Sequence, residues 1–447
     1  MKTRFIKDLD KEADETLIEI QAWISSKRKH KNLTFLDIVD STGKVQVVIN
    51  KNELQQNKYF ELSRLKPDTA ITLYGRKRKS GAGGIEVIVS DIQIVAENKK
   101  SIFPEPRCDF DIFNEKYSDH VLKNRHIYLR NPKLAAALKF KSNFIFEAHR
   151  YFSERDFVLI DAPVLTKLLL YDDASAFKLD YSDKISGKQE VFLSQCCTFQ
   201  LESAVHVFEK VYNITPSFRA EHGKSNRHLR EYWHLKAELA WVNLDDLITI
   251  AEDMMYMISK NTYEKSEKEL KTLDTKVNLD KLKPPFDRIT YDEASEIIRK
   301  EGKDFIWGKS LSIEDEQILT KYHGEKLLWV RGIPCSAEAF PFARDSQNPL
   351  ITKTCDLIAP DGFGELMGTA EKITDKKELL ERMAEKGKTT PEQLERYQWY
   401  IDLRDHGMVP HGGIGVGIER VIRYLLQTNH VRNVVSFPRL YGRIPNP

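Results

Sequence analysis

Five short stretches rich in β-branched residues lie within residues 16–97, and they constrain the fold more than any other feature of the sequence. They read TLIEIQAWI, LTFLDIVD, KVQVVIN, TAITLYGRKR and GIEVIVSDIQIVA, and turn signals such as DSTG and SGAGG separate them. Five strands in about 80 residues are typical of a small closed barrel, and an OB-fold is the obvious candidate.

A basic segment, KRKHK at residues 27–31, follows the first of these stretches, and Phe35 comes shortly after it. A positively charged surface beside an aromatic ring is suited to unpaired nucleotides, because it attracts phosphates and stacks on bases. A solvated charged rim on an ordinary barrel is the alternative, and composition alone does not separate the two.

Bulk composition excludes several classes of protein. At 447 residues the chain is too long for one core, so two domains are expected. Lys+Arg 69 against Asp+Glu 67 gives a net charge of +2, which leaves room for one basic face. No apolar run approaches the ~20 residues of a membrane helix, and MKTRFIKDLDKEADE holds no signal-peptide core. The 5 cysteines form no CxxC pair, so neither zinc nor a disulfide framework is indicated. We therefore expect a cytoplasmic protein without a membrane partner.

Composition also divides the chain into segments. We expect a barrel domain in residues 1–100, a polar linker in residues 101–128 and a second domain in residues 129–447. Helical spacing of apolar residues begins in PKLAAALKFKSNFIFEAHRYFSERDF, and strands and helices mix beyond it. The highly charged residues 259–285 predict a helix that ends in a surface connection. The predicted fold class is α+β.

The segment VYNITPSFRAEHGKSNRHLREYWHLKAELAW, residues 211–241, holds the most informative polar residues. Two extended stretches flank the loop HGKSNR, which predicts a β-hairpin with a long tip. Side chains alternate along a strand, so one face can hold a nucleoside triphosphate without a glycine-rich phosphate loop. The alternative is an amphipathic hairpin with a salt-bridged outer face. The face is expected to carry Arg219, Glu221, Tyr232, His234, Lys236 and Glu238, with Arg227 and His228 from the loop.

Three motifs in the right order carry a family resemblance. FRAE and RHLREYW have the form of motif 2 of the class II aminoacyl-tRNA synthetases, in residues 211–241. PHGGIGVGIERVIRYLL, residues 410–426, has the form of motif 3, and SERDFVLIDAPVLT, within about residues 140–165, resembles motif 1 at the dimer interface. With an N-terminal OB-fold, the chain resembles the aspartate, asparagine and lysine subclass, and within it the asparaginyl-tRNA synthetases.

The resemblance implies an antiparallel catalytic sheet of six to seven strands flanked by helices, an ATP-dependent, AMP-forming ligase and a homodimer. Formation of an adenylate is attack of a carboxylate on the α-phosphorus of ATP, so the enzyme must align the reactants and neutralise charge. A catalytic Arg219 would contact both the substrate carboxylate and the α-phosphate, with Arg420 as the second catalytic residue. Tyr232 would stack on adenine, with Glu221 near its amino group. The γ-phosphate would be held by Arg227, His228 and Arg420, and Mg²⁺ by Asp356 and Glu365.

The same resemblance implies that tRNA accepts the activated amino acid, as in protein biosynthesis. Phe35 and Gln46 fall where this subclass stacks on and hydrogen-bonds the central uridine of the anticodon, with Arg28 beside them. A base turned out of a loop is recognised by stacking and edge contacts, which fits an aromatic ring and an amide. Phe35 as ordinary barrel core is the alternative.

The substrate pocket departs from the family pattern. The sequence has Leu201-Glu202 where the aspartate enzymes have a lysine first, which favours asparagine. Four positions differ from the asparagine family, however. Tyr171 occupies the place of a glutamate, Thr198 that of a glutamine, Lys236 that of an acid and Lys372 that of an arginine. A pocket rebuilt for asparagine is one interpretation, and a more anionic acid, without tRNA as acceptor, is the other. A regulator that binds nucleic acid without catalysis is a third possibility. The expected pocket is Tyr171, Asp172, Asp173, Gln195, Thr198, Leu201, Glu202, Lys236, Lys372 and His411.

Overall fold

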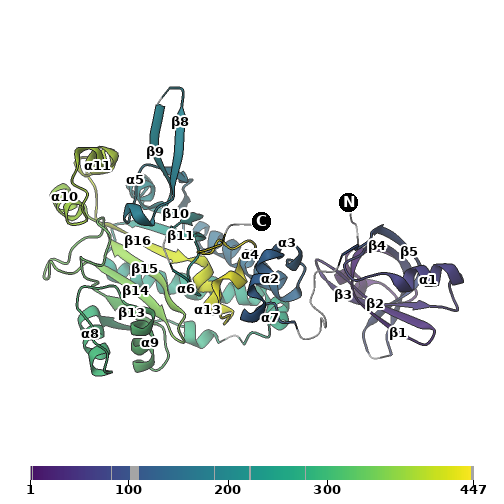
Figure 1. Ribbon diagram of the computed structural model, residues 1–447. Coiled ribbons are helices and arrows are strands. Elements are labelled where there is room, and N and C mark those ends of the chain that lie inside the picture. Colours follow the sequence, from purple (N-terminus) through teal and green to yellow (C-terminus); the bar gives the residue numbers. More distant parts are fainter. Residues whose placement is uncertain are drawn as a thin grey trace. The chain divides into compact units, whose positions relative to one another are not determined.

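The computed structural model describes residue 2 and residues 4–81, 83–100, 110–185, 187–220, 223–276 and 278–443. The chain forms two compact units, Met1–Asp109 and Phe110–Pro447 (Figure 1). No helix within the described residues has the length and apolar character needed to cross a membrane.

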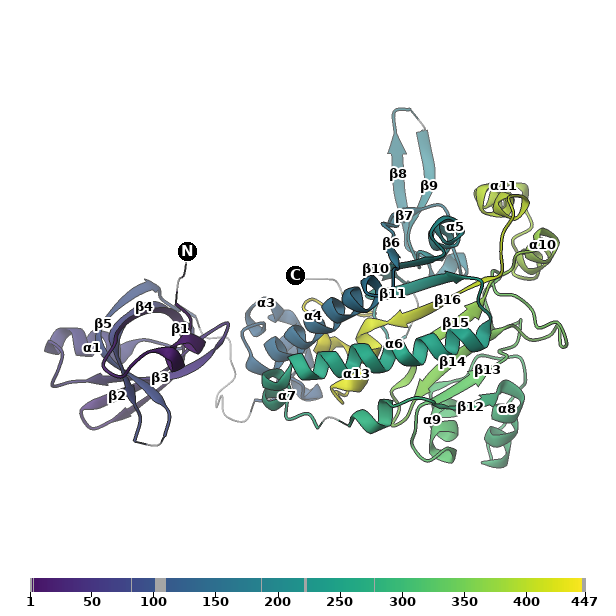
Figure 2. The ribbon, with the colours of Figure 1, turned by 180° about the vertical axis from the view of Figure 1, so that it is seen from behind.

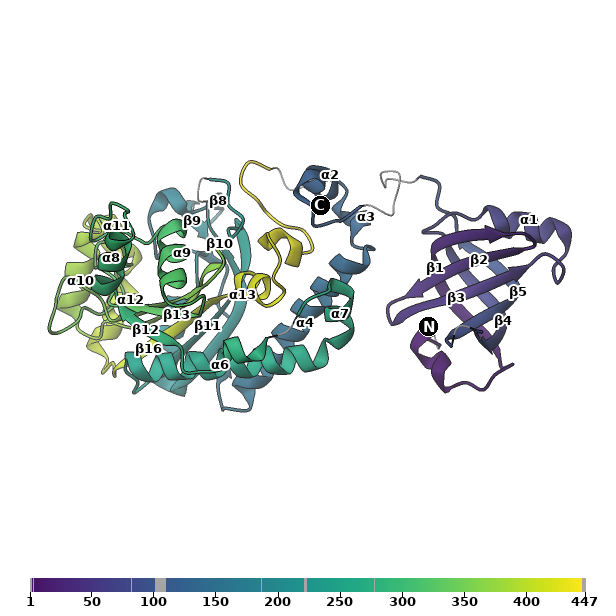
Figure 3. The same ribbon diagram turned by 90° about the horizontal axis from the view of Figure 1, so that it is seen from below.

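The first unit is a closed five-stranded barrel with strand order β1-β2-β3-β5-β4 (Figure 3). Alternate side chains of each strand point inward, so that Ile18, Ile20, Ala22 and Ile24 of the first strand lie in the core. The predicted OB-fold is therefore confirmed. Its elements are β1 (Leu17–His30), β2 (Leu33–Asp40), β3 (Gly43–Asn50), α1 (Gln56–Arg64), β4 (Ala70–Lys79) and β5 (Ile85–Ala96).

The second unit is built on one large sheet with strand order β12-β13-β14-β15-β16-β11-β10-β6. Its strands are β6 (Val158–Leu159), β10 (Lys210–Phe218), β11 (Glu231–Ala240), β12 (Asp287–Thr290), β13 (Leu328–Arg331), β14 (Thr354–Ala359), β15 (Gly364–Glu371) and β16 (His411–Gly417). The sheet has eight strands, where six to seven were expected. The two edge strands, β6 and β12, pair in parallel, whereas the interior pairs are antiparallel. These edge strands are 2 and 4 residues long, which is too short to show an alternating pattern in the sequence.

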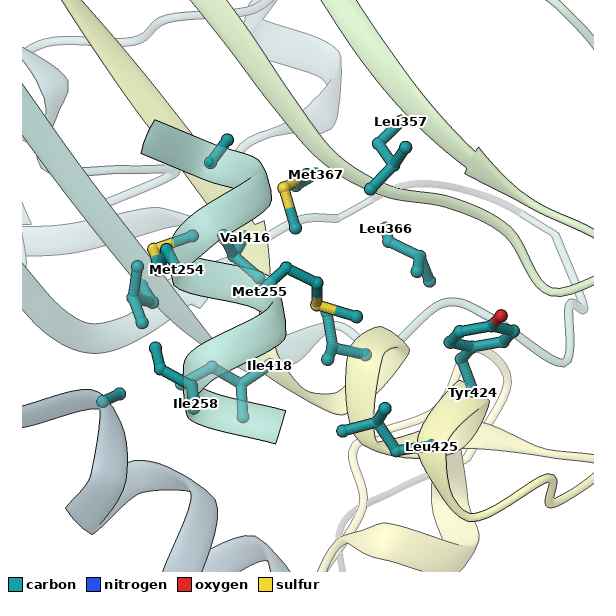
Figure 4. Packing of buried hydrophobic residues seen from close by; sticks show 14 of the residues in the cluster. Met254, Met255, Ile258, Leu357, Leu366, Met367, Val416, Ile418, Tyr424 and Leu425 are labelled. Atoms are coloured by element: carbon teal, nitrogen blue, oxygen red, sulfur yellow. The ribbon is translucent and has the colours of Figure 1, made fainter. Parts of the chain in front are cut away.

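Two long helices cover one face of this sheet (Figure 2). They are α4 (Pro132–Ser153), within the predicted helical segment, and α6 (Leu244–Lys265). Asn243 and Asp246 form a capping box that starts α6. Figure 4 shows Met254, Met255 and Ile258 of α6 packed near Met367 of β15 and Val416 of β16. Because one face is closed by this core, the polar residues of the same strands lie on the opposite face.

The remaining elements border the sheet. A small sheet with order β7-β9-β8 projects from one end (Figure 1). α5 packs against β10 and β11. The elements are α2 (Ser118–Lys123), α3 (Arg125–Tyr128), β7 (Leu165–Thr166), β8 (Lys178–Asp183), β9 (Gly187–Leu193), α5 (Thr198–Phe208), α7 (Glu267–Leu273), α8 (Tyr291–Lys300), α9 (Ile313–Tyr322), α10 (Lys376–Glu385), α11 (Pro391–Arg396), α12 (Gln398–Asp402) and α13 (Ile418–Leu425).

Part of the segment expected as a linker, residues 101–128, is folded. Residues 101–109 lie outside the described part of the chain, but the helices α2 and α3 follow. Arg125 is buried and donates hydrogen bonds to the carbonyls of Arg432, Val435 and Ser436. These carbonyls belong to residues far from Arg125 in the sequence, so no local sequence pattern predicts the contact.

Candidate active site

Glycines opposite large polar side chains make room on the free face of the sheet. His234, Lys236 and Glu238 of β11 pair with Gly417, Gly415 and Gly413 of β16, respectively. A methyl group at Gly413 would overlap the carboxylate of Glu238, and one at Gly368 would lie 2.8 Å from Oδ1 of Asp356. The glycine-rich strand therefore leaves a hollow that larger residues would fill. The shared face of Tyr232, His234, Lys236 and Glu238, predicted from strand alternation, is confirmed because these side chains line the two adjoining cavities.

The hollow consists of a larger cavity of about 360 Å³ and a smaller one of about 70 Å³. Both are lined by Arg219, Arg227, His234, Glu365 and Gly415, so the two volumes meet there. The smaller one adds Tyr232, His228 and Arg420, and the larger one adds Tyr171, Lys236, Glu238, Asp356 and Lys372. One connected chamber thus brings together residues spread over 250 positions of sequence, from 171 to 420.

Arg219 lies at the junction, between two tyrosine rings. Its Cζ is 4.5 Å from the ring centroid of Tyr171 and 5.8 Å from that of Tyr232. One of its terminal nitrogens donates a hydrogen bond of 3.0 Å to the hydroxyl of Tyr171. A guanidinium held between aromatic faces is oriented in advance, which suits binding of a carboxylate or phosphate.

Positive charge gathers around the smaller cavity. Arg227 forms an ion pair with Glu316, and Arg420 donates to the carboxylate of Glu365 at 3.1 Å. Burial, together with Arg420 and Arg227, lowers the pKa of His228 to about 3. His228 is therefore neutral at physiological pH and can donate one hydrogen bond. Of the residues expected here, Glu221 lies outside the described part of the chain.

Carboxylates gather on the neighbouring strands. Asp356 and Glu365 lie on β14 and β15 and line the same cavity. Burial raises the pKa of Asp356 well above its ordinary value, and the charges of Glu365, Glu338 and Glu316 raise it further. Burial also raises the pKa values of Glu338 and Glu316 to about 7. Glu338 and Glu316 were missed in the sequence, because neither lies within a motif.

The far end of the larger cavity carries two lysines. Lys236 donates a hydrogen bond of 2.6 Å from its ammonium to the hydroxyl of Thr198. Lys372 is 6% exposed, and its ammonium lies 4.4 Å from the ring centroid of Phe342. Glu238 lines the wall near both, and burial raises its pKa to about 7 against the opposing charge of Lys372.

A fully buried ion pair lies behind this end. Glu202 accepts hydrogen bonds from Tyr400 at 2.7 Å and Arg404 at 3.1 Å, and His411 lies 3.5 Å away. Burial opposes ionisation of Glu202, but His411, Arg404 and Lys372 together lower its pKa to about 2. Neither Glu202 nor His411 lines the cavity, so both support the pocket from behind.

Other expected pocket residues have different surroundings. Leu201 packs in an apolar cluster with Cys197, Val205 and Val211. Gln195 accepts from the backbone N–H of Tyr171 and donates to Ser175, so it fixes the loop before β8. Asp172 is exposed and accepts from the N–H of Ser175, and the side chain of Asp173 lies outside the described structure.

The barrel brings together the three residues expected to bind tRNA. Arg28 donates a hydrogen bond of 2.7 Å to Gln46, and its Cζ lies 5.8 Å from the ring centroid of Phe35. The neighbours of Phe35, Thr34 and Leu36, are fully buried, whereas Phe35 itself is half-buried on the outer side of β2. The ring is therefore not ordinary barrel core.

Two family models match the chain. The model described as tRNA synthetases class II (D, K and N) matches residues 118–441, and the one described as OB-fold nucleic acid binding domain matches residues 18–95. The chain therefore belongs to the class II tRNA synthetases of the D, K and N type. The resemblance indicated by the three motifs is confirmed, and enzymes of this class use ATP.

The relatives narrow the assignment within that family. The chain is 32% identical to the asparagine–tRNA ligase of Pyrococcus abyssi over 443 residues, which cover 98% of each protein. It is also 32% identical to that of Desulforamulus reducens over 448 residues, covering 99% of this chain and 100% of the relative. The crystal structure of asparaginyl-tRNA synthetase from Pyrococcus horikoshii complexed with asparaginyl-adenylate matches with a TM-score of 0.92, 31% identity and coverage of 100% of both chains.

Proposed function

We propose that this chain joins ATP and an amino acid into an aminoacyl-adenylate at Arg219, with release of pyrophosphate, and then transfers the aminoacyl group to a tRNA, with release of AMP. The observation that carries the proposal is the position of Arg219 at the junction of the two cavities. A ligand in either cavity can reach this side chain. The relatives are named for asparagine, so asparagine is the first amino acid to test.

Arg219 bridges the two reactants in this proposal. A planar guanidinium can bind a carboxylate through one edge while it donates to the α-phosphate through another. The two reacting groups are both anionic, and a fixed positive charge between them reduces their repulsion and stabilises the charge that develops as the new bond forms. The tyrosines on either side hold the guanidinium in place, so little reorganisation is needed.

The smaller cavity is assigned to the nucleotide. Tyr232 offers its ring to adenine, with Glu221 expected near the amino group of that base. The γ-phosphate is assigned to Arg227, His228 and Arg420. Glu316 and Glu365 hold the two arginines before ATP arrives, since each carboxylate is paired with one of them.

Asp356 and Glu365 are suited to Mg²⁺. Their oxygens are the ligand type that this ion prefers. Burial raises the pKa of Asp356, and the neighbouring carboxylates raise it further, so a bound cation would relieve their repulsion. Among the described residues, no group of three His, Cys, Asp or Glu side chains is arranged to hold a metal alone. The ion would therefore need phosphate oxygens as well, and it would neutralise charge on the triphosphate.

The barrel is assigned to tRNA. Phe35, Arg28 and Gln46 form a stacking ring, a cation and an amide on one outer surface, which matches the needs of an unpaired base. We assign them to the anticodon and its central uridine. Residues 1–100 would act as the anticodon-binding domain, residues 129–447 as the catalytic domain, and the cytoplasm would be the site of action.

A homodimer is part of the proposal. Motif 1, in residues 140–165, includes the edge strand β6, whose Val158 and Leu159 are 37% and 52% exposed. Phe146 of α4 is 61% exposed. Exposed apolar residues on a sheet edge and the helix before it are suited to a subunit interface. Light scattering of the wild type and of Leu159→Asp tests this assignment, and we expect the variant to dissociate.

A second candidate substrate is favoured by one observation. Lys236 and Lys372 both line the larger cavity, where the family pattern has an acid and an arginine. A more anionic carboxylic acid is therefore the alternative to asparagine, and an acceptor other than tRNA goes with it.

Pyrophosphate exchange and tRNA charging test the proposal together. The full chain should exchange labelled pyrophosphate into ATP only when the correct acid is present, and it should then charge tRNA. Pyrophosphate exchange without charging of tRNA would support adenylate formation and contradict tRNA as the acceptor. Nucleotide binding without exchange for any acid would contradict the proposed reaction.

A further inference from the structure

We propose that Lys236 and Lys372 together bind a second carboxylate on the acid that this enzyme activates, so that the pocket prefers an acidic end group over a carboxamide. The inference rests on the proposed adenylate formation, because it places the reacting carboxylate at Arg219. It adds the chemical class of the other end of the substrate.

The two lysines share one wall of the larger cavity. Lys236 extends over Gly415, whose added methyl would lie 3.4 Å from its Cε and 3.8 Å from its ammonium nitrogen. Lys372 follows β15 directly, and its backbone N–H donates a hydrogen bond of 3.0 Å to the carbonyl of His411 on the neighbouring strand β16. Both side chains line the same cavity as Arg219, which places all three on the surface that a bound acid would meet.

The positive charge of these lysines is incompletely balanced. Among the described residues, no carboxylate oxygen lies within the 4.0 Å of an ion pair from either ammonium. Lys236 donates to the neutral hydroxyl of Thr198, and Lys372 lies over the ring of Phe342. Two ammonium groups that line one cavity repel each other unless an anion joins them.

The nearby acids do not remove this imbalance. Glu202 interacts with Lys372, but it also accepts from Tyr400 and Arg404, so its single negative charge offsets the lysine only in part. Glu238 lines the cavity next to the lysines, and burial raises its pKa to about 7, so a large part of it is protonated at neutral pH. The described part of this end of the cavity therefore favours a negatively charged ligand.

Hydrogen-bonding chemistry leads to the same class of ligand. A lysine ammonium has donors only, and a carboxylate has acceptors only, so two lysines and one carboxylate are fully complementary. A carboxamide turns its NH₂ group toward at least one donor in the same position. One observation favours a carboxamide instead: the buried Oε1 of Glu238 has no hydrogen-bond partner and can accept from an amide NH₂.

Matched pairs of acid and amide test the inference. Binding of acyl-sulfamoyl adenosines to the full chain, measured by calorimetry, isolates the end group for aspartate and asparagine, glutamate and glutamine, and succinate and succinamate. In the pair that binds best, we expect the acid to bind at least about tenfold more tightly. Tighter binding of the amide in that pair overturns the inference.

Variants assign the preference to the lysines. Lys236→Gln and Lys372→Gln should each weaken the acid-ended analogue about tenfold and change the amide-ended one less than threefold. Lys353→Gln is the matched control, because Lys353 pairs with Glu371 and does not line the cavity. Acid binding that survives both substitutions overturns the inference.

Glu238→Gln separates the two end groups further. This substitution should leave binding of the acid-ended analogue unchanged or stronger, since it removes negative charge. Weaker binding of the amide-ended analogue, with no binding of the acid-ended one, would show that the pocket selects a carboxamide. Pyrophosphate exchange with the free acids then tests the reaction itself. Tight acid binding without exchange contradicts the proposed function but supports the inference, and binding of neither analogue contradicts both.

Discussion

The guanidinium of Arg219 stacks on the ring of Tyr171 at 4.5 Å and donates a hydrogen bond to its hydroxyl at 3.0 Å. The tyrosine is itself held by Gln195, which accepts from its backbone N–H. Arg219 is the residue to which both reactants are assigned, so Tyr171 is a positioning residue for it. The resemblance leads one to expect a glutamate at this position, and the tyrosine found there contacts Arg219 instead.

Substitution of Tyr171 should affect activation in a graded way. Tyr171→Phe keeps the aromatic face and should stay within about threefold of the wild type in kcat/KM for pyrophosphate exchange. Tyr171→Ala removes the stacking as well, which is worth roughly 1–2 kcal/mol in a desolvated site, so we expect a loss of about tenfold. A positioning role predicts that kcat falls more than the KM for ATP rises. Equal kcat/KM for the Ala variant and the wild type would contradict this role.

Arg219→Ala should abolish activation while the protein stays folded. Removal of one preorganised charge donor typically lowers a rate by ~10²–10³-fold, and this donor serves both reactants. Pyrophosphate exchange measures the loss, and circular dichroism checks the fold. Arg230→Ala is the matched control, because Arg230 lies on the same hairpin, stacks on Phe177 and lines neither cavity. Near-normal pyrophosphate exchange in Arg219→Ala would contradict the assignment of residues 211–241 as motif 2.

Binding of tRNA should depend on Phe35. Stacking of one base on an aromatic ring is worth roughly 1–3 kcal/mol, so Phe35→Ala should weaken tRNA binding by about one to two orders of magnitude. Activation of the amino acid without tRNA should not change. Phe60→Ala provides the control, since Phe60 is a 44% exposed aromatic residue of the same barrel with Lys51 near its ring. Unchanged tRNA affinity in the folded Phe35 variant would contradict the assignment.

How far the sequence predicted the site depends on whether a contact is local or long-range. The period of two along β11 was sufficient to place Tyr232, His234, Lys236 and Glu238 on one face, and the motifs fixed Arg420. The ion pair between Arg227 and Glu316 joins residues 89 positions apart, and only folding brings α9 beside the hairpin.

Substitution at one position can also change a partner elsewhere, which a sequence pattern does not show. Tyr171 was expected to face the substrate, and it also stacks on Arg219. Leu201 was expected in the pocket, and it instead belongs to an apolar cluster under α5. In both cases the residue type was clear from the sequence, whereas its contacts depended on the packing of another element.

The buried pair of Glu202 and Arg404 should dominate the stability of the pocket wall. Both side chains are 0% exposed, so Arg404→Met removes the cation that donates to a buried carboxylate, and we expect a loss of about 3–5 kcal/mol in the free energy of unfolding. Glu202→Gln should reduce the free energy of unfolding less in the Arg404→Met variant than in the wild type, because in that variant it removes a carboxylate that has already lost Arg404. Urea unfolding of the four proteins measures this coupling, and strictly additive losses would contradict it.

The same pair should produce a pH dependence of defined sign. Burial opposes ionisation of Glu202, but His411, Arg404 and Lys372 lower its pKa from 4.5 to about 2 in the folded protein. The folded state therefore binds this proton less readily than the unfolded state. The stabilisation is present above pH 4.5 and is lost as the pH falls toward about 2. The difference in unfolding free energy between the wild type and Glu202→Gln should accordingly shrink as the pH is lowered from 6 to 3, and a constant difference over that range would show that Glu202 does not carry the charge.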